Sequence, residues 1–558
     1  MISSDDSRLT LGRFLDDIAE RYGDRRAIFF EGRILTFAGL AADSRALSRA
    51  LVGAGVVKGT RVAVLMSNRP EFIVCAFAIA RVGGVLVPVN TFANVEERDF
   101  ILRHSDTSVL LLQSTLLKHA YVDELRAAHP ELDRGVPGRL RIPELPCLRR
   151  VVALDATETS GGIESWADLL AYGEDVSNEL VDAICAEVEP ADDGVIIYTS
   201  GTTADPKGVL HAQRSPVLQG YRFADILLYD PDDRVYTAYP FFWGAGLAMS
   251  IAGTLAAGAS LLLEQTFDPG SALEVMEAQR ATALHAWAHQ QSAIAEHPSA
   301  ASRDLSMLAK VESSGPMGKL LGVEKDVYGV GSSYGLSETF TLSSMLPANT
   351  PAPIRRATHG RPLPGMTIRI VDPESGEPLP TGAAGEIAVK GVTFMRGYYK
   401  TLPETFLDEN GFYRTQDSGS LDAEGYLHWS GRLSNVIKTG GANVSPVEIE
   451  RCVAGCPGVH DGIALGIPHP KLGEVIVLGV TPNEGATVVP EDVRDYLRGK
   501  LSSYKVPRCV LVFREEELSY TGTQKVQVAP VREIVVSRLE RERAVIAGHQ
   551  YGVADPAS

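Results

Sequence analysis

A stretch rich in hydroxyl groups and glycine, Tyr198 to Gly208 (YTSGTTADPKG), follows an apolar run that is typical of a buried strand. Glycine lets the backbone bend and approach a ligand closely. Ser and Thr hydroxyls donate hydrogen bonds and Lys207 adds a mobile positive charge, so the stretch suits a phosphate chain. It differs from the common phosphate-binding loop G-x-x-x-x-G-K-[ST], because its Lys precedes the Gly. The competing interpretation is a polar surface turn between two strands.

Further along the chain, other residues offer complementary chemistry. In YGLSET (334–339), Tyr334 can stack on a flat base, while Ser337 and Glu338 supply the hard oxygens that suit Mg²⁺. In YRTQDSG (413–419), the carboxylate of Asp417 can accept both hydroxyls of a ribose. Each motif alone is common in turns and on surfaces, but their joint order favours a nucleotide site.

Composition limits the class of protein. A chain of 558 residues exceeds what one core usually supports, so we expect two or more domains. The net charge of −17 disfavours nucleic acid or an anionic membrane as the main partner. Six Cys without a C-x-x-C pair, and a polar N-terminus without a signal peptide, favour the cytoplasm. The uncharged segment 244–263 is predicted to be a buried helix, a turn at Gly258 and a strand, not a membrane span.

Strand-like and helix-like patterns alternate in the first third of the chain, with strands expected at 61–67, 84–90 and 108–113 and a helix at 70–83. This alternation predicts a parallel sheet flanked by helices. Residues 130–165 are rich in Pro and Arg, and we expect them to form a surface excursion. Strands are expected again at 194–200, 259–265, 282–288 and 310–315.

From about residue 366, short strands separated by turns predict a small antiparallel, barrel-like sheet. After Arg432 the pattern becomes α+β. The fold class predicted is therefore α/β, with parallel βαβ sheets and a small antiparallel sheet in a large N-terminal domain, 1–432. A smaller, mobile α+β domain, 433–558, follows.

Over roughly residues 10 to 535 the chain resembles the adenylate-forming superfamily, which includes acyl-CoA synthetases, nonribosomal adenylation domains and luciferases. The resemblance rests on YTSGTTADPKG, YGLSET, GRPLPG, GYYKTLPET, YRTQDSG and the run that begins at Gly431 and Arg432. It implies that a carboxylic acid attacks the α-phosphorus of ATP to give an acyl-adenylate, and that coenzyme A then takes the acyl group. It also implies Mg²⁺ as a cofactor and a C-terminal domain that rotates between the two steps.

Matching residue by residue, the resemblance assigns each group of residues a role. Lys525, Glu338 and Ser337 are implied to be catalytic, with Lys525 bridging the acid and the α-phosphate, and Glu338 and Thr202 are implied to hold the metal. The residues implied to bind ATP are Thr199, Ser200, Gly201, Thr202, Thr203, Lys207, Gly315, Pro316, Ser333, Tyr334, Gly335, Asp417 and Arg432. Those implied to line the acyl pocket are Trp243, His285, Trp287, Ser314 and Gly331, and the thiol path is assigned to Lys438, Gly440 and Gly441.

Four positions depart from the usual pattern of the superfamily. Ser434 stands at the hinge where Asp or Lys is usual, Gln416 replaces a Gly before Asp417, Gln524 replaces the Gly before Lys525, and Trp243 replaces a His. If the segment from His285 is extended, His285, Trp287 and His289 fall on one face. A bulky, partly polar lining favours a compact or aromatic acid, whereas the alternative is that these are core aromatics beside a buried sheet.

Several alternatives remain open from the sequence. The acyl acceptor is expected to be coenzyme A, but a separate carrier protein or an amine is compatible with the altered hinge and late motif. A degenerate nucleotide-binding protein is disfavoured, because Lys207, Glu338, Asp417 and Lys525 are all retained. A monomer or a homodimer is expected.

Overall fold

A computed structural model of the chain describes residues 8–199, 206–330, 333–435, 437–439, 442–501, 505–518 and 526–552. The chain divides into two compact units, Met1–Ile368 with Val389–Tyr413 and Arg369–Ala388 with Arg414–Ser558. The boundary predicted after Arg432 separates a static domain from a mobile one. This boundary stays a prediction.

The main sheet of the first unit has the strand order β19-β11-β10-β4-β3-β5-β8-β9. Neighbouring strands from β10 through β9 run parallel, whereas β11 is antiparallel to both β10 and β19. The strands are β3 (Arg61–Leu65), β4 (Val85–Pro88), β5 (Val109–Leu112), β8 (Arg150–Ala153), β9 (Ile163–Ser165), β10 (Asp193–Thr199), β11 (Lys207–Ala212) and β19 (Gly397–Tyr398). The parallel sheet predicted from the alternating strand and helix patterns is therefore confirmed.

Strands β8 and β9 correct the prediction for residues 130–165. These residues do not simply loop over the surface, because β8 and β9 extend the parallel sheet beyond β5. All of β8 is buried, and the guanidinium of Arg150 pairs with Glu164 at 2.8 Å and lies 4.4 Å from the ring centroid of Tyr172. Because Arg150 at the start of β8 is charged, the sequence was interpreted as polar surface, although this arginine is buried and paired.

A second sheet of the first unit has the order β14-β12-β13-β1-β2, with β2 antiparallel to β1 and the other pairs parallel. The segment 244–263 forms the π-helical η2 (Gly246–Gly253), α9 (Thr254–Ala256), a turn at Gly258 and the buried β13 (Ser260–Leu263), as predicted. No described helix combines the length and the apolar character needed to cross a membrane. The predicted strand at 310–315 is reduced to one bridge, between Lys310 and Ala283. The remaining strands are β1 (Arg26–Phe30), β2 (Arg33–Thr36), β12 (Arg234–Thr237) and β14 (Ala283–His285).

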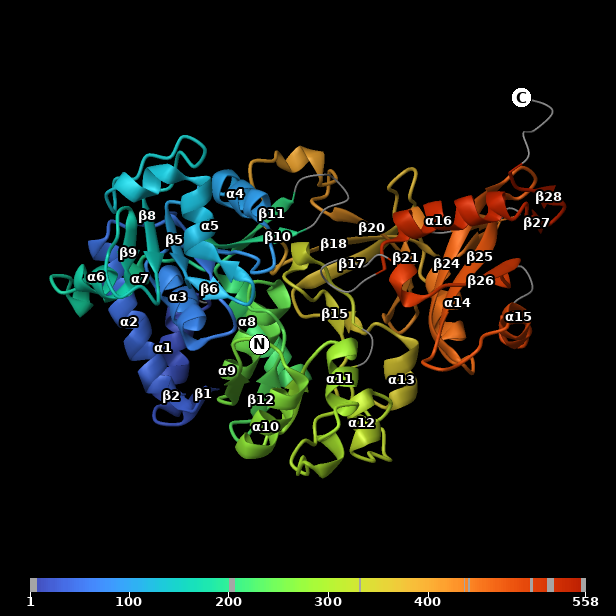
Figure 1. Cartoon of the computed structure of the whole chain (residues 1–558), viewed down its shortest axis with the longest axis horizontal. Coiled ribbons are helices and arrows are strands. Elements are labelled where there is room, and N and C mark those ends of the chain that lie inside the picture. The colour runs from blue at the N-terminus through green and yellow to red at the C-terminus, as the bar shows by residue number, and fades with distance from the viewer. Residues whose placement is uncertain are drawn as a thin grey trace. The chain divides into compact units, whose positions relative to one another are not determined.

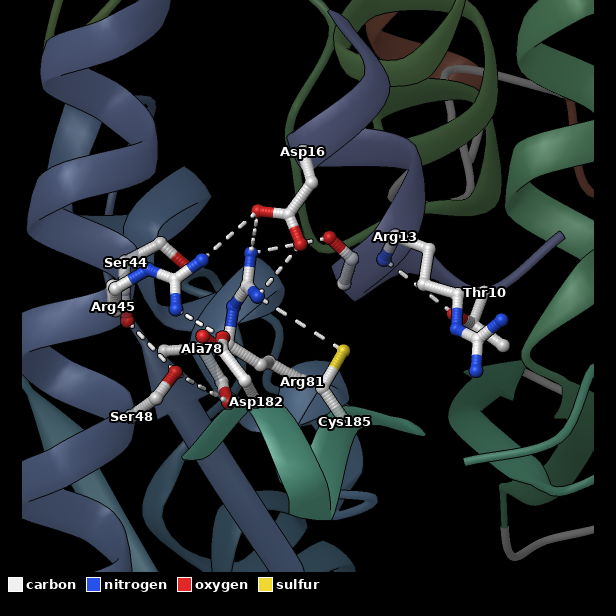
Figure 2. Close-up of polar contacts among 11 residues, drawn as sticks. Thr10, Arg13, Asp16, Ser44, Arg45, Ser48, Ala78, Arg81, Asp182 and Cys185 are labelled. Carbon is white, nitrogen blue, oxygen red and sulfur yellow. Dashed lines mark hydrogen bonds and ion pairs between the residues drawn. The ribbon is translucent and has the colours of Figure 1, made fainter. Parts of the chain in front are cut away.

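A buried arginine, Arg81, links residues of four helices of the first unit (Figure 2). The side chain of Arg81 is 0% exposed, and its two terminal nitrogens donate to the Asp16 carboxylate at 2.9 and 2.6 Å. It also donates to the Gly12 carbonyl at 3.2 Å and lies 3.9 Å from the Cys185 sulfur, while Arg45 lies 3.6 Å from Asp16. We call these five residues the Arg81 network. Its helices are α1 (Leu11–Tyr22), α2 (Phe37–Gly53), α3 (Pro70–Arg81) and α7 (Asn178–Ala186).

Among the described residues, the second unit contains two larger sheets and the two-stranded pair of β27 (Val545–Ile546) and β28 (His549–Gln550). One has the order β17-β18-β20-β21, in which β20 and β21 are antiparallel, and the other has the order β23-β22-β25-β24, with β26 parallel to β25. Helices α14 and α16 pack against β24 (Figure 1). These elements are β17 (Met366–Val371), β18 (Gly385–Gly391), β20 (Tyr413–Leu421), β21 (Leu427–Arg432), β22 (Ile437–Thr439), β23 (Ala442–Val444), α14 (Pro446–Val453), β24 (Val459–His469), β25 (Gly473–Pro482), α15 (Pro490–Arg498), β26 (Cys509–Val512) and α16 (Val528–Arg541).

Candidate active site

The predicted phosphate-binding stretch joins β10 to β11. Thr199, the last residue of β10, pairs with Lys207, the first residue of β11, and the side chain of Lys207 is exposed. The four residues Ser200, Gly201, Thr202 and Thr203 lie outside the described residues, so their phosphate and metal contacts stay predictions. The structure therefore places Lys207, the cation of the predicted phosphate-binding stretch, at the start of β11.

Lys207 and Glu338 both contact Tyr398. The Tyr398 hydroxyl donates to Glu338 Oε1 at 2.5 Å, and Lys207 Nζ lies 5.1 Å from the centroid of the Tyr398 ring. The Tyr413 hydroxyl lies 2.9 Å from that of Tyr398 and 3.5 Å from Glu338 Oε1. Burial and the Glu338 carboxylate raise the pKa of Tyr398, which keeps its hydroxyl protonated. We call these four residues the Tyr398 group. From the sequence, Tyr398 was identified only as part of the motif GYYKTLPET, with no role of its own.

The backbone of Ser337 and Glu338 is held in a short 3₁₀ turn, η4 (Ser337–Thr339). His211 Nε2 lies 2.7 Å from the Ser337 carbonyl and must carry the proton, because a carbonyl only accepts. Burial lowers the pKa of His211 to about 3, so this ring is neutral near pH 7. The N–H of Met395 donates to the Glu338 carbonyl at 2.7 Å. Contacts from β11 and from the 389–413 segment therefore fix this turn.

Tyr334 and Gly335 begin the loop that leads to Glu338. Tyr334 is 5% exposed and is bridged to Ser344, with 3.0 Å between nitrogen and oxygen in both directions. A Cβ on Gly335 would lie 1.6 Å from the Thr341 carbonyl oxygen, so only glycine fits there. Ser333 is exposed. The loop holds Tyr334 firmly, and its adenine contact stays a prediction.

Two further predicted residues lie at the start of a helix. Gly315 precedes α12 (Pro316–Leu320), where Pro316 takes the first-turn position that suits proline. Ser314 is exposed, and Gly331 lies outside the described residues. Their roles in binding ATP and the acid stay predictions.

Three of the residues predicted to line the acyl pocket belong to one aromatic cluster with Tyr239. The ring of Tyr239 is stacked on His285 with centroids 5.7 Å apart, and its centroid is 4.3 Å from that of Trp287. The Trp243 and Trp287 centroids are 6.3 Å apart. Sequence reasoning missed Tyr239 as a pocket residue, although it is the first residue of the YPFFWGAG run that contains Trp243. The cluster shows these rings together, and their contact with an acid stays a prediction.

His285 is the polar member of this cluster. It is 2% exposed, with Nε2 2.6 Å from the Tyr229 hydroxyl and Nδ1 3.2 Å from the Ser250 hydroxyl. Burial lowers its pKa to about 3, so it is neutral near pH 7. His289 does not join it: β14 ends at His285, and His289 lies exposed on α11 (Ala288–Ala295). The expectation of one extended face was wrong, because a helix begins at Ala288.

In the second unit, Asp417 and Arg432 are cross-strand partners on β20 and β21, with Arg432 Nε 3.1 Å from Asp417 Oδ1. The Asp417 side chain is 4% exposed, whereas that of Arg432 is 51% exposed. Gln416 has a φ of 60°, a left-handed conformation that favours glycine. The glycine usual in the superfamily at this position thus has a backbone reason, and Gln416 retains the conformation without it.

The remaining predicted residues are only partly described. Ser434 lies in the 3₁₀ turn η6 (Leu433–Asn435), and Lys438 is exposed on β22, where its N–H donates to Glu474 at 2.7 Å. Gly440, Gly441 and Lys525 lie outside the described residues. The hinge, the thiol path and the late lysine therefore stay predictions.

The side chains present fit a magnesium ion that arrives with ATP. Mg²⁺ keeps several waters and is usually bound through one or two carboxylates plus substrate phosphates. Glu338 is half-buried, and within the described residues its Oε2 has no hydrogen-bond partner. Across the described part of the chain, no three His, Cys, Asp or Glu side chains gather as a dedicated metal site. A metal shared with substrate phosphates is consistent with this arrangement.

Comparisons with known proteins show which family the chain resembles. Residues 15–399 match the family described as AMP-binding enzyme, and residues 448–525 match the AMP-binding enzyme C-terminal domain. The chain is 29% identical to the putative acyl-CoA synthetase YngI of Bacillus subtilis, over 94% of this chain and 96% of that protein. It is 30% identical to an indoleacetate–CoA ligase of Aromatoleum aromaticum, over 96% of this chain and 100% of that protein. The crystal structure of ATP-bound MatB from Rhodopseudomonas palustris superposes with a TM-score of 0.76 at 26% identity, covering 94% and 98% of the two chains.

Proposed function

The chain belongs to the AMP-binding enzyme family and is an ATP-dependent acid–CoA ligase, and we propose which of its residues act in each step of that reaction. A carboxylate oxygen of the acid attacks the α-phosphorus of ATP, and the bond to the pyrophosphate oxygen breaks. The product is an acyl-adenylate. The thiolate of coenzyme A then attacks the acyl carbon, and AMP leaves with the electron pair of the broken C–O bond.

We propose that Lys207 offsets charge on the β- and γ-phosphates and that Glu338 holds the Mg²⁺ that accompanies them. When bound, Mg²⁺ neutralises phosphate charge as a Lewis acid. The observation that supports both roles is the Tyr398 group, in which a cation and a carboxylate from distant parts of the chain contact one tyrosine, the cation at its ring and the carboxylate at its hydroxyl. Asp417 is proposed to accept the ribose hydroxyls, and Lys525 to bridge the acid and the α-phosphate.

We propose a compact aromatic acid as substrate. The rings of Tyr239, Trp243 and Trp287 offer flat faces on which an aromatic acid can pack. His285 is neutral beside them, so the described cluster offers no cation for a second carboxylate. A dicarboxylic acid would therefore bind poorly.

The finer expectations from the sequence are carried forward as part of this proposal. They are rotation of the C-terminal domain about Ser434, a thiol path along Lys438, Gly440 and Gly441, a cytoplasmic location, and a monomeric or homodimeric state. None is needed for the chemistry of the first step.

The test is pyrophosphate release with ATP and Mg²⁺ across aromatic, alicyclic, aliphatic and dicarboxylic acids, each with and without coenzyme A. We expect sustained turnover only with coenzyme A, yielding AMP and a thioester, with aromatic acids fastest. Turnover that needs an amine or a carrier protein instead would reassign the acceptor. Faster turnover with long aliphatic or dicarboxylic acids would overturn the substrate class.

A further inference from the structure

Tyr398 is held by backbone and packing before its polar contacts are considered. It lies in β19, whose residues pair with Val209 and Leu210 of β11, and flanking N–H groups of Arg396 and Tyr399 each donate to β11 carbonyls at 2.7 Å. Its side chain is 9% exposed and packs against Val209 in a buried apolar cluster. The phenol therefore has little freedom to reorient.

The hydroxyls form a directed chain toward Glu338. Because a phenol has one proton and the Glu338 carboxylate only accepts, the proton of Tyr398 points to Oε1 at 2.5 Å. The single proton of the Tyr413 hydroxyl has two acceptors within reach, the Tyr398 oxygen at 2.9 Å and Glu338 Oε1 at 3.5 Å. This chain holds Oε1 in place and leaves Oε2 without a hydrogen-bond partner among the described residues.

The ring of the same tyrosine contacts the cation. Lys207 Nζ lies 5.1 Å from the ring centroid, within the range of a cation–π contact. In the part of the chain that the structure describes, Lys207 has no carboxylate partner, so this contact is what orients it. One side chain thus contacts both groups to which phosphate-binding roles are proposed.

We propose that Tyr398 is a positioning residue for nucleotide binding: its hydroxyl orients Glu338 for the metal that accompanies ATP, and its ring orients Lys207 for the phosphates. This inference rests on the roles proposed for Glu338 and Lys207. The hydroxyl of Tyr398 can be removed without its ring, so the two functions can be tested separately. Groups that orient metal-binding side chains typically matter by about 10- to 100-fold in metal affinity or activity.

The test compares Tyr398→Phe, which removes only the hydroxyl, with Tyr398→Leu, which also removes the ring. ATP affinity is measured by titration calorimetry with Mg²⁺ and with EDTA, together with the Mg²⁺ concentration for half-maximal pyrophosphate release. We expect Tyr398→Phe to weaken ATP binding about 10-fold with Mg²⁺ only, and excess Mg²⁺ to restore its rate partly. Tyr398→Leu is expected to weaken binding in EDTA as well, because Lys207 is then unsupported.

The matched control is Tyr399→Phe, since the neighbouring hydroxyl donates instead to Asp106 at 2.9 Å. It should bind ATP like the wild type in both conditions. Wild-type ATP affinity and Mg²⁺ dependence in Tyr398→Phe would overturn the inference while leaving the ligase activity intact. A wild-type enzyme without acid-dependent pyrophosphate release would instead overturn the proposed function.

If Tyr398→Phe fails to fold, Tyr413→Phe interrupts the same hydroxyl chain one position further out. It is expected to raise the half-maximal Mg²⁺ concentration by a smaller factor, about 3-fold. An unchanged Mg²⁺ requirement in this variant would equally overturn the role of the hydroxyl chain.

Discussion

The Arg81 network and the Tyr398 group both place charged side chains against the buried core of the first unit, but they differ in how completely those charges are paired. Arg81 is fully buried and makes hydrogen bonds to Asp16 and Gly12. Within the described ranges, exposed Lys207 contacts a ring and no carboxylate, and Glu338 uses one of its two carboxylate oxygens. Both terminal nitrogens of Arg81 face a carboxylate, and among the described residues only its buried Nε lacks a hydrogen-bond partner, an arrangement that suits stability. The oxygen that Glu338 leaves without a described partner has capacity for a ligand instead. Substitutions in the two regions should therefore separate stability from activity.

The largest effect is expected on the stability side. Asp16→Ala leaves the buried guanidinium of Arg81 without its carboxylate, which should lower the free energy of unfolding by about 3–5 kcal/mol. Denaturant unfolding measures this, and turnover per folded molecule should not change. The control is Asp182→Ala, whose partner Arg45 is 29% exposed, with an expected cost of about 1 kcal/mol or less. Equal costs for the two variants would contradict the role given to burial.

The second effect is expected on the activity side. Lys207→Ala should slow pyrophosphate release about 100- to 1,000-fold, because charge on the phosphates is no longer offset, while the denaturation midpoint stays unchanged. Lys400→Ala is the matched control, since that lysine is 46% exposed and pairs with Asp106 at 2.8 Å. A comparable loss in both variants would point to general electrostatics and not to a phosphate contact.

Buried histidines extend the comparison to groups that stay neutral. Burial lowers the pKa of His285 from 6.5 to about 3, so below pH 6.5 the unfolded chain binds a proton that the folded chain does not. Stability is therefore full above pH 6.5 and is lost as pH falls toward 3, by about 1.4 kcal/mol per pH unit. Unfolding measured between pH 6.5 and 5 should show a shallower loss in His285→Gln. An unchanged slope would mean that His285 binds its proton equally well in the folded and the unfolded chain.

The smallest effect concerns backbone strain next to Asp417. Gln416→Gly should stabilise the second unit by about 1 kcal/mol or less, because a φ of 60° suits glycine better than glutamine. Thermal unfolding gives the sign, and Thr415→Gly, at a neighbouring residue of the same strand without positive φ, should destabilise instead. A lower melting temperature in Gln416→Gly would show that the lost side chain outweighs the relieved strain.

Much of the fold could be predicted because strand signals were local. The apolar runs at 61–67, 84–90 and 108–113 became β3, β4 and β5. The run at 150–153 was missed because its arginine is compensated by Glu164, a partner that a strand pattern does not reveal. His289 was misplaced because the sequence around it does not show that the strand ends at His285 and that a helix begins at Ala288.

The site was less predictable because its geometry depends on contacts across the chain. Glu338 and Lys207 were identified from residue type and motif, but nothing in their own segments indicates that Tyr398 contacts both. Tyr239 was missed for the same reason, since only packing brings it onto His285 and Trp287. Motifs thus identified reactive groups, and the groups that orient them required the three-dimensional fold.

The pairing of β19 with β11 has a consequence for how the protein is made. Synthesis runs from the N-terminus, so Lys207 and Glu338 are both translated before Tyr398 and Tyr413. A nascent chain that ends between residues 338 and 398 carries the cation and the carboxylate but not the tyrosine that joins them. Nucleotide affinity should therefore be acquired late on the ribosome, after most of the main sheet has been translated.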